Sequence, residues 1–367
     1  MVQAKQWVMK AAPIPGKPFN FNFKDDKATF KLIEKELSEK DLSDGDLLVQ
    51  TCYLSNDPAQ KFWIATVDKN YSAGVSPGEI IPARGIGKVI ASKNAGYQVG
   101  DYISTYTGWT THVVITKTKL DEGFSSKISK DKVGELWWYL SVFGGTALTA
   151  YFIFYKYAEL QEREEDYGKV FLISGAAGAV GNVCIQLAVH AFKASKVIAI
   201  AGGAEKVKYV ESFGKNVVGV DYKDPNFKEN LMKAAGGVNT VDYFIDNVGG
   251  EILDLGVNLL KQKAMLLACG SISGYNDSSK LVFKNYVSVI TKRLTIKGLL
   301  LTDNLSEFPQ GMAKLQELVQ KGSLDVATSA TLKDATGDKF QEVPLIWDGL
   351  FKGTNKGKLI TKVCDCC

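Results

Sequence analysis

The spacing of hydrophobic residues changes near residue 135, and this change divides the chain into two regions. Up to about residue 134, short apolar segments such as 47–52, 87–91 and 111–115 are separated by glycine, proline and long loops. Short strands bounded by turn residues are typical of a β-rich domain. A turn expected at 96–101 precedes a further strand.

From about residue 136, apolar runs of strand length alternate with segments of helical spacing. The expected strands are 170–173, 197–200, 217–220, 241–245 and 265–268. In the first connecting segment Val180, Cys184, Leu187 and Ala191 recur at helical intervals. Alternation of strands and helices predicts a parallel sheet covered by helices on both faces, an α/β fold.

The last part of the chain departs from this alternation. A strand is expected at 294–299, an amphipathic helix at 306–321 and short strands that end with 358–363. We expect this last segment to rejoin the first domain. The predicted organisation is therefore a discontinuous β domain of 1–134 and 329–367, with a parallel-sheet domain of 135–328 between its parts.

One expected strand runs directly into a glycine-containing loop at 174–181. Gly175 would permit a tight turn, Gly178 would let backbone approach a pyrophosphate, and Gly181 would let a helix pack close to the strand. A diphosphate would then lie against the free N–H groups of the helix start. A plain strand-to-helix turn is the alternative, but the four strands that follow favour dinucleotide binding.

The end of the second strand indicates which dinucleotide is bound. Enzymes that use NAD place an acidic residue there, about 20 residues after the loop, to bind the ribose. Here 199–204 contains no acid, and Lys206 follows in a position to meet a phosphate, although Glu205 precedes it. These residues favour NADPH over NADH.

Composition and charge exclude several classes of partner. Apolar residues make up 46% of the chain and charged residues 23%, which is ordinary for globular proteins. The net charge is +4, and the lysines are dispersed, so nucleic acid is not expected as a partner. No run of 18 apolar residues or apolar N-terminal leader is present, so we expect no membrane insertion and a cytoplasmic location.

The cysteines and histidines do not form a recognisable metal site. Cys52, Cys184 and Cys269 lie in apolar segments and are expected to be reduced core thiols. The tail cysteines, Cys364, Cys366 and Cys367, lack further ligands nearby, and we expect a solvated tail.

The two histidines and one acidic run are also expected to be structural. His112 should pack or hydrogen-bond locally, and His190 should face solvent from a helix, so a zinc alcohol dehydrogenase is not expected. The acidic run 162–166 is interpreted as the solvated end of a helix.

Four segments, 108–112, 174–181, 246–250 and 269–276, occur in a distinctive order. Together they resemble the prostaglandin reductase and alkenal double-bond reductase family, a zinc-independent branch of the medium-chain dehydrogenase/reductase superfamily. The resemblance extends from 54–58 to 355–358. It implies a GroES-like β domain, a Rossmann domain, an active site between them and a homodimer.

The resemblance also implies an activity, namely NADPH-dependent reduction of the activated C=C bond of small α,β-unsaturated aldehydes or ketones (enals or enones). In that reaction the cofactor supplies the hydride and the protein orients the reactants. A quinone oxidoreductase of the same superfamily and a non-catalytic NADPH-binding protein are the alternatives. The signatures at 246–250 and 270–276 favour the alkenal reductases over the quinone reductases.

Candidate site residues come from the loop and from the resemblance together. By the resemblance, Lys206 and Tyr222 hold the 2′-phosphate. The candidate cofactor-binding residues are Gly175, Gly178, Ala179, Val180, Gly181, Lys206, Tyr222, Asn247, Cys269, Gly270, Ser271, Ile272, Tyr275, Leu299, Leu301 and Asn355. Tyr275 is also the candidate catalytic residue, with its hydroxyl near the developing enolate oxygen, and its alternative role is a cofactor contact or a packed aromatic ring.

Two positions depart from the family pattern. Ala59 follows the segment 54–58 where relatives usually have tyrosine, and Thr291 stands where another tyrosine is often found. Both changes remove bulk and a phenol from the expected substrate pocket. The preferred substrate is therefore expected to differ from that of better-known members.

Overall fold

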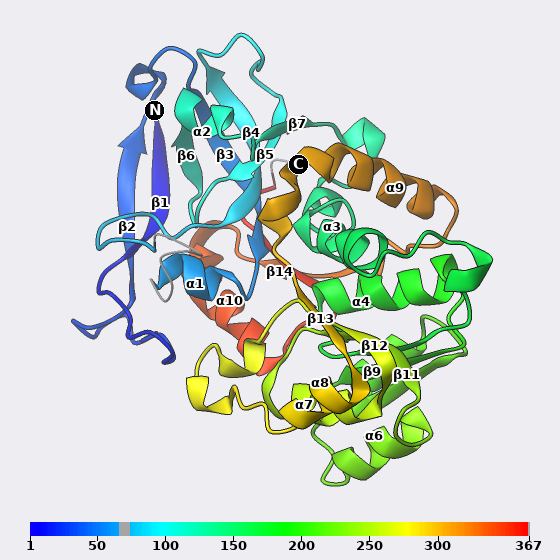
Figure 1. Cartoon of the computed structure of the whole chain (residues 1–367). Helices are drawn as coiled ribbons and strands as arrows, with labels where there is room; N and C mark the ends of the chain where they lie inside the picture. Colours follow the sequence, from blue (N-terminus) through cyan, green and yellow to red (C-terminus); the bar gives the residue numbers. More distant parts are fainter. Residues whose placement is uncertain (66–73, 366–367) are drawn as a thin grey trace. The chain divides into compact units, whose positions relative to one another are not determined.

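Residues 1–65 and 74–365 are described by a computed structural model, drawn in Figure 1 with colours that follow the chain. Their contacts divide into two units. Unit 1 comprises Met1–Leu140, Thr331–Thr354 and Leu359–Cys367, and unit 2 comprises Ser141–Ala330 and Asn355–Lys358. The segment Asn355–Lys358 was expected in the β domain, and it belongs to unit 2 because Gly357 N donates to Ala177 O at 2.8 Å.

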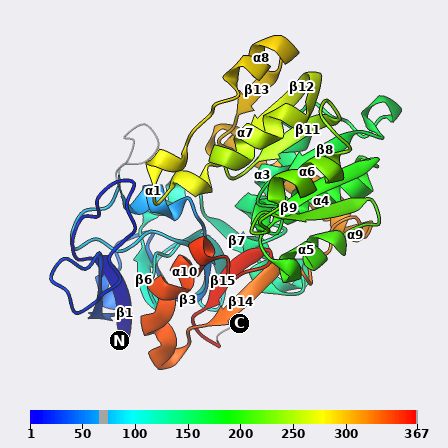
Figure 2. The same cartoon turned by 90° about the horizontal axis from the view of Figure 1, so that it is seen from below.

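Unit 2 contains a six-stranded sheet in the order β10-β9-β8-β11-β12-β13, and Figure 2 labels its strands β9, β8, β11, β12 and β13. Its strands are β8 (Val170–Ile173), β9 (Lys196–Ala201), β10 (Val217–Asp221), β11 (Val241–Asp246), β12 (Leu260–Ala268) and β13 (Thr295–Gly298). Neighbouring strands of this sheet pair in parallel. The strand order reverses between β8 and β11, and ligands of such sheets bind at the carboxyl ends of the strands beside that reversal.

Helices cover both faces of this sheet, as predicted. In Figure 1, α3 and α4 lie on one side of the sheet, and α6 and α7 lie on the other. The helices are α3 (Gly145–Phe152), α4 (Ala179–Gln186), α5 (Ala204–Glu211), α6 (Phe227–Ala235), α7 (Gly250–Leu259), α8 (Tyr286–Lys292) and α9 (Phe308–Gln320). The shorter helical turns are Ile153–Tyr157, Glu164–Asp166, Leu187–Ala191, Ile272–Gly274, Ser278–Lys280 and Leu301–Glu307.

The expected strands of unit 2 are confirmed because their apolar runs are buried from both sides. Leu172, Ile198 and Phe244, from three adjacent strands, are fully buried in one hydrophobic cluster. Strand β12 starts at Leu260, directly after α7 and five residues before the expected start of this strand.

Two expectations for unit 2 and the tail need correction, and a third, the helix at 306–321, is confirmed. The acidic run is not a solvated helix end, since Glu162 pairs with Lys314 Nζ at 2.9 Å and Asp166 is buried. The helix expected at 306–321 is α9, and a 3₁₀ segment precedes it. Cys364 is disulfide-bonded, and Cys366 and Cys367 lie outside the described residues.

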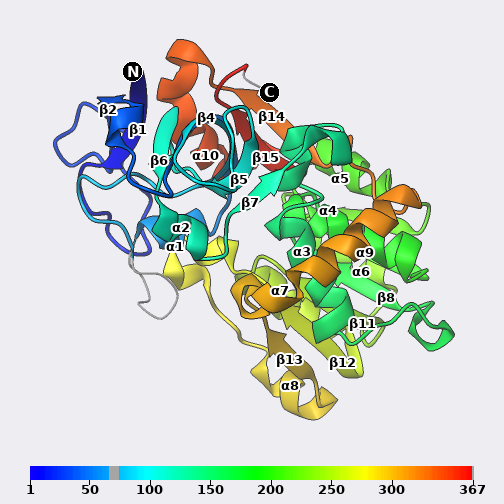
Figure 3. The ribbon, with the colours of Figure 1, turned by 90° about the horizontal axis from the view of Figure 1, so that it is seen from above.

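Unit 1 contains a larger sheet, parts of which are drawn in Figure 3. Its strands run in the order β14-β15-β3-β4-β5-β7, with β6 also paired to β3, and β1 and β2 form a separate antiparallel pair. The strands are β1 (Val2–Met9), β2 (Phe30–Leu37), β3 (Leu47–Asn56), β4 (Arg84–Ser92), β5 (Tyr102–Tyr106), β6 (His112–Ile115), β7 (Ser126–Ile128), β14 (Ala330–Asp334) and β15 (Lys358–Lys362). The helices are α1 (Gln60–Ile64), α2 (Lys117–Asp121) and α10 (Val343–Lys352), with short turns at Glu39–Asp41, Lys130–Lys132, Leu136–Leu140 and Gly337–Glu342.

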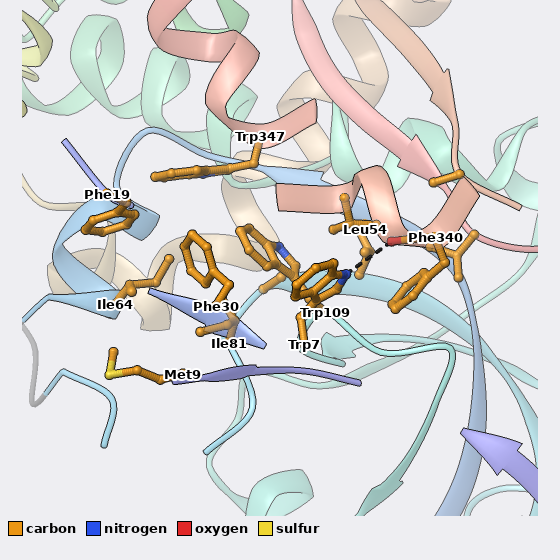
Figure 4. Packing of buried hydrophobic residues seen from close by; sticks show 14 of the residues in the cluster. Trp7, Met9, Phe19, Phe30, Leu54, Ile64, Ile81, Trp109, Phe340 and Trp347 are labelled. Atoms are coloured by element: carbon orange, nitrogen blue, oxygen red, sulfur yellow. Dashed lines mark hydrogen bonds between the residues drawn. The ribbon is translucent and has the colours of Figure 1, made fainter. Parts of the chain in front are cut away.

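Aromatic side chains from both ends of the chain form one core of unit 1. Trp109 packs between Phe30, at a ring separation of 5.3 Å, and Trp347 of α10, at 5.9 Å (Figure 4). Trp7 Nε1 donates a hydrogen bond to Phe340 O at 3.1 Å. These contacts explain why the C-terminal segment rejoins the N-terminal region, since large buried aromatic surface drives their association.

The ammonium group of Lys61 is buried beside this aromatic core. Lys61 is 1% exposed, and Nζ donates to Lys17 O at 2.5 Å and lies 3.5 Å from the centre of the Phe19 ring. Burial lowers the pKa of Lys61 to about 8, and the carboxylate of Asp348 opposes this shift. A lysine ammonium buried without a close carboxylate is costly, so this position is sensitive to pH.

We expect the folded protein to gain stability from Lys61 as the pH rises from about 8 to 10.5. In this range the unfolded chain holds the Lys61 proton and the folded protein does not, so the free energy of unfolding increases with pH. The gain is at most about 3 kcal/mol. Below pH 8 Lys61 is protonated in both the folded and the unfolded protein, so its contribution to the free energy of unfolding no longer changes with pH. Urea unfolding of the wild type and Lys61→Met should show this slope in their difference, whereas a constant difference contradicts it.

Candidate functional site

The glycine loop of unit 2 joins β8 to α4 with the geometry that the sequence predicts. Gly175 has a φ of +59°, a left-handed conformation that glycine adopts without strain. A Cβ on Gly181 would lie 2.4 Å from Gly175 O and 2.6 Å from Ala176 Cα. Gly181 therefore lets α4 start directly against the loop, which confirms its expected packing role.

The start of α4 is open to a ligand. Gly178 precedes the helix, and Gly178, Ala179 and Val180 are partly exposed. The first N–H groups of any α-helix lack an acceptor within the helix. Those of Ala179, Val180 and Gly181 are thus suited to an anion, and the dipole of α4 favours negative charge at the same place.

A buried carboxylate holds the loop against β11. Asp246 Oδ1 accepts from Ser174 Oγ at 2.6 Å and from Val248 N at 3.1 Å, and Oδ2 accepts from Gly249 N at 3.0 Å. Asn247 Nδ2 donates to Ser174 O at 2.7 Å. Burial raises the pKa of Asp246, and the three donors oppose that shift. Asn247 and Asp246 therefore fix the two strand ends relative to each other.

Replacing Asp246 by asparagine should lower the free energy of unfolding by about 1–3 kcal/mol. Both carboxylate oxygens accept hydrogen bonds, and the amide NH₂ of asparagine would face the Ser174 or Gly249 donor. Glu251→Gln is the matched control, because the Glu251 side chain is 69% exposed and its carboxylate pairs with Lys228 at the surface, at 3.1 Å. Equal unfolding temperatures for Asp246→Asn and Glu251→Gln would show that the hydrogen bonds of Asp246 do not stabilise the loop.

Lys206, which lies on α5 just after β9, is affected electrostatically by two other lysines of unit 2. Burial lowers the pKa of Lys206, and the positive charges of Lys223 and Lys356 lower it further. Glu205 lies 3.5 Å from Lys356 Nζ and is 78% exposed, so it offsets little of this charge. We call Lys206, Lys223 and Lys356 the lysine cluster. Cations held together in this way are suited to a dianionic phosphate.

Tyr222 lies beside the lysine cluster. A Cβ on Gly202 would lie 2.6–2.9 Å from atoms of the Tyr222 ring, so the ring covers the end of β9. Asp221 Oδ1 accepts from Gly203 N at 2.8 Å and from Lys223 N at 2.9 Å. Asp221 thus shapes the two loops from which Tyr222, Lys206 and Lys223 extend.

The segment around Asn355 lies against the glycine loop. Gly357 forms a β-bridge with Gly178, and Gly357 N donates to Ala177 O at 2.8 Å. Asn355 is buried, and its Nδ2 donates to Gly357 O at 2.6 Å. Asn355 therefore supports this segment, which also carries Lys356, whose Nζ lies 3.5 Å from a carboxylate oxygen of Glu205, the residue next to Lys206.

The remaining candidates lie on two loops of unit 2. Cys269, Gly270, Ser271 and Ile272 follow β12, and Cys269 N and Gly270 N both donate to Asp246 O. Burial, together with the nearby Asp246 carboxylate, raises the pKa of Cys269 to about 12, so the thiol is protonated at neutral pH. It is therefore not poised as a nucleophile.

Tyr275, Leu299 and Leu301 follow strands β12 and β13 of unit 2. Tyr275 is half-buried directly after the turn Ile272–Gly274, and its N donates to Ile272 O at 3.3 Å. Leu299 and Leu301 are half-buried after β13. The catalytic role of Tyr275 remains a prediction.

The positions that depart from the family pattern lie in different units. Ala59 precedes α1 in unit 1, and Thr291 is exposed on α8 in unit 2, where its Oγ1 donates to Val287 O at 3.2 Å. The Thr291 hydroxyl is thus used within its own helix.

Within the described residues, no three His, Cys, Asp or Glu side chains gather as metal ligands. His112 is half-buried, its Nδ1 lies 3.2 Å from Thr111 Oγ1, and burial lowers its pKa. His190 is exposed on the turn after α4. Both histidines have the local, structural surroundings expected from the sequence.

Sequence reasoning missed several residues of this site. Lys223 and Lys356 were not singled out, because they are distant in sequence from Lys206. Asp246 was noticed only as part of a motif, although a lone acid that ends an apolar strand next to a glycine loop is a usable signal.

Two family models match the chain. The model described as the N-terminal domain of oxidoreductase matches residues 5–122, and the one described as zinc-binding dehydrogenase matches residues 179–317. A solved structure, CurA of Vibrio vulnificus in complex with NADPH, superposes with a TM-score of 0.82 at 23% identity, covering 98% of this chain and 99% of that one.

Curated relatives match along nearly the whole chain. An uncharacterized membrane protein of Saccharomyces cerevisiae is 68% identical over 99% of both chains, whereas the described part of this chain has no helix long and apolar enough to cross a membrane. Prostaglandin reductase 1 of Bos taurus is 29% identical, covering 99% of this chain and 100% of its own. The NADP⁺-dependent 2-alkenal reductase of Nicotiana tabacum is 28% identical, covering 99% and 98%.

These matches agree with the GroES-like and Rossmann folds expected from the sequence motifs. The chain belongs to the zinc-independent medium-chain dehydrogenase/reductase family that includes the prostaglandin and alkenal reductases.

Proposed function

We propose that this protein is an NADPH-dependent oxidoreductase that reduces the activated C=C bond of α,β-unsaturated aldehydes or ketones. The single observation that carries the cofactor assignment is the lysine cluster beside the glycine loop in one unit. Relatives named prostaglandin reductase and NADP⁺-dependent 2-alkenal reductase support the reaction class. The proposed activity and substrate class are thus supported by the cofactor site and by the names of these relatives.

The residues of unit 2 fit a phosphorylated dinucleotide. The N–H groups at the start of α4 would bind the diphosphate, and Gly178 leaves room for its approach. Lys206, Lys223 and Tyr222 would hold the 2′-phosphate, and Lys356 adds charge at the same place. NADPH, when bound, supplies the hydride that the reaction consumes.

The reaction adds two hydrogens across the C=C bond. A hydride goes to the β-carbon and a proton goes to the α-carbon, so that the carbonyl group is retained. The protein must stabilise negative charge on the carbonyl oxygen during this addition. We propose the Tyr275 hydroxyl for that role, because Tyr275 lies on the loop after β12 at the carboxyl edge of the sheet.

A substrate panel tests this proposal. Purified protein is assayed with enals, enones, quinones and saturated aldehydes, each with NADPH and with NADH. We expect NADPH oxidation with enals or enones, a saturated carbonyl product, and weak activity with NADH. Quinone reduction without enone reduction would instead indicate a quinone oxidoreductase. Tight NADPH binding with no turnover on any substrate would indicate a non-catalytic binding protein.

We also propose that the protein forms a homodimer through β13 and α8. Strand β13 is the last strand of its sheet, and Tyr286, Val287 and Ile290 of α8 are 60%, 66% and 64% exposed. An unpaired strand edge beside exposed apolar side chains favours association with an identical edge.

Ile290→Lys should convert a dimer of two 40.0 kDa chains into monomer. A buried lysine would carry an unpaired charge at the contact. Light scattering after gel filtration measures the mass. Lys233→Glu on α6 is a surface control that should leave the mass unchanged. A monomeric wild type, or an unchanged variant, would contradict the assignment of this surface.

A further inference from the structure

A short segment of unit 2, residues 325–329, contacts two helices that carry parts of the candidate cofactor site. Asp325 N donates to Gln186 Oε1 of α4 at 2.6 Å. Thr328 O accepts a hydrogen bond from the hydroxyl of Tyr209, on α5, at 3.0 Å. Since α4 begins at the glycine loop and α5 follows β9, the 325–329 segment links the two places where the cofactor phosphates are expected.

The same segment also pairs with the part of the chain that carries Lys356. Lys358 N donates to Ser329 O at 2.8 Å. A Cβ on Gly357 would lie 2.2 Å from Ser329 O, so the two backbones are in direct contact at this glycine. All of these residues belong to unit 2. The 325–329 segment therefore joins α4, α5 and the Lys356 segment within one unit.

Side-chain hydrogen bonds give the 325–329 segment a fixed shape. Asp325 Oδ1 accepts from Ala327 N at 2.8 Å, and its Oδ2 accepts from Thr328 Oγ1 at 2.6 Å. Ser329 Oγ donates to Val326 O at 2.7 Å. A carboxylate that accepts from the N–H two residues later stabilises a turn. The turn thus holds the carbonyl groups of Thr328 and Ser329 in place for their partners.

Two buried amides connect the 325–329 segment to the glycine loop. Gln186 and Asn182 are each 1% exposed, and Gln186 Nε2 donates to Asn182 Oδ1 at 3.3 Å. Asn182 Nδ2 in turn donates to Gly178 O at 2.8 Å. Buried polar side chains are costly unless they are hydrogen-bonded, so this chain of amides fixes the segment relative to the start of α4.

Tyr209 connects the 325–329 segment to the helix of Lys206. The two residues are three apart on α5, and residues at that spacing lie on the same face of a helix. The half-buried ring of Tyr209 packs edge to face on Phe213 at 5.0 Å. Burial and the carboxylate of Asp325 raise the pKa of Tyr209, so its hydroxyl keeps the proton that it donates. The bond to Thr328 O therefore helps to fix the position of α5.

We propose that Tyr209 is a positioning residue for the 2′-phosphate of NADPH, because it holds Lys206 and Lys356 close enough to bind one phosphate together. This inference rests on the proposed function, in which NADPH is the cofactor. Tyr209 acts through its bond to Thr328 O, whereas the phosphate is bound by the lysines. Charge-assisted hydrogen bonds are short, so a small displacement of either lysine weakens them. NADH lacks the 2′-phosphate, and its binding does not depend on this arrangement.

The test measures the dissociation constants of NADPH and NADH by fluorescence titration. Tyr209→Phe removes only the hydroxyl, and it should reduce the preference for NADPH over NADH by about 3- to 10-fold, the effect of losing one hydrogen bond. Tyr167→Phe is the matched control, because the half-buried Tyr167 also donates to a backbone carbonyl of unit 2, Glu162 O, at 2.5 Å. Its preference should equal that of the wild type. A merely structural Tyr209 would weaken both nucleotides equally, and that result overturns the proposal.

The same titrations separate this proposal from the proposed function. A wild type that prefers NADPH, with an unchanged preference in Tyr209→Phe, overturns the positioning role alone. A wild type that binds both nucleotides equally overturns the cofactor assignment and this proposal together. Neither titration needs turnover, so enone reduction is tested independently. If thermal unfolding shows that Tyr209→Phe has lost its fold, Thr328→Val decides, because Thr328 is exposed and the variant loses the bond to Asp325 that shapes the turn. A lowered preference for NADPH then supports the proposal, and an unchanged one overturns it.

Discussion

Lys206→Glu should weaken NADPH binding by about 100-fold or more, and it should weaken NADH binding far less. The wild-type side chain would donate to the 2′-phosphate, whereas the glutamate would repel it, and each effect is worth on the order of 1.5–3 kcal/mol. Only NADPH carries that phosphate, so the ratio of the two dissociation constants is the measured quantity. Fluorescence titration of both reduced nucleotides measures it directly.

Lys208→Glu is the matched control for this experiment. Lys208 lies on the same helix, α5, and is exposed, and the charge change is identical. Burial and the charges of Lys223 and Lys356 lower the pKa of Lys206, which places Lys206 within the lysine cluster. If the two variants weaken NADPH binding equally, the effect is a general change of charge and the 2′-phosphate assignment is wrong.

The sequence predicts the glycine loop well because the loop depends on local rules. An apolar strand, three glycines and a helical repeat lie within about twenty residues, and each glycine has its own steric reason. The structure bears this out for Gly175, through its positive φ, and for Gly181, through its close approach to Gly175 O. The contacts that matter are between residues close in the chain.

The lysine cluster could not be predicted in full, because its members come from three separate segments. Lys206 was identified from its place after the second strand, but Lys223 follows the third strand and Lys356 lies near the C-terminus. Lys356 reaches the cluster because Gly357 bridges to Gly178. Periodicity carries no information about that long-range contact, and it placed 355–358 in the wrong domain.

Arg84 shows a different limit of sequence reasoning. Its neighbour Tyr106 is 22 residues away, and only the antiparallel register of β4 and β5 brings the two side chains to the same face of the sheet. A sequence gives the strands but leaves their register open, since a shift of one residue would turn every side chain to the other face. Side-chain contacts across a sheet therefore cannot be predicted before its register is known.

These three cases share one physical cause. Backbone features that depend on residue type, such as the glycine loop, are specified locally. Clusters of charged side chains, such as the lysine cluster, depend on which segments the fold brings together from distant parts of the sequence. The cofactor site combines the two, so its phosphate-binding loop can be predicted while the residues that distinguish NADPH from NADH are only partly visible in sequence.

Gly181→Ala should lower the free energy of unfolding by about 3 kcal/mol and weaken NADPH binding. Overpacking of a tight contact typically costs 1–3 kcal/mol and sometimes more. Here the added Cβ would lie 2.4 Å from Gly175 O and 2.8 Å from Ala176 O, which are backbone atoms that cannot swing aside. Helix propensity alone predicts the opposite sign, a gain of about 1 kcal/mol, because Gly181 lies within α4.

The opposite signs make the Gly181→Ala experiment decisive about how the loop is built. Gly298→Ala is the control, because a Cβ there would meet no atom within 4 Å and Gly298 has no positive φ. Urea unfolding should show a large loss for Gly181→Ala and a small change for Gly298→Ala. A stabilised Gly181→Ala would mean that α4 does not press against the loop. The N–H groups of α4 would then not be held where a diphosphate needs them, and the basis for cofactor binding would fail with them.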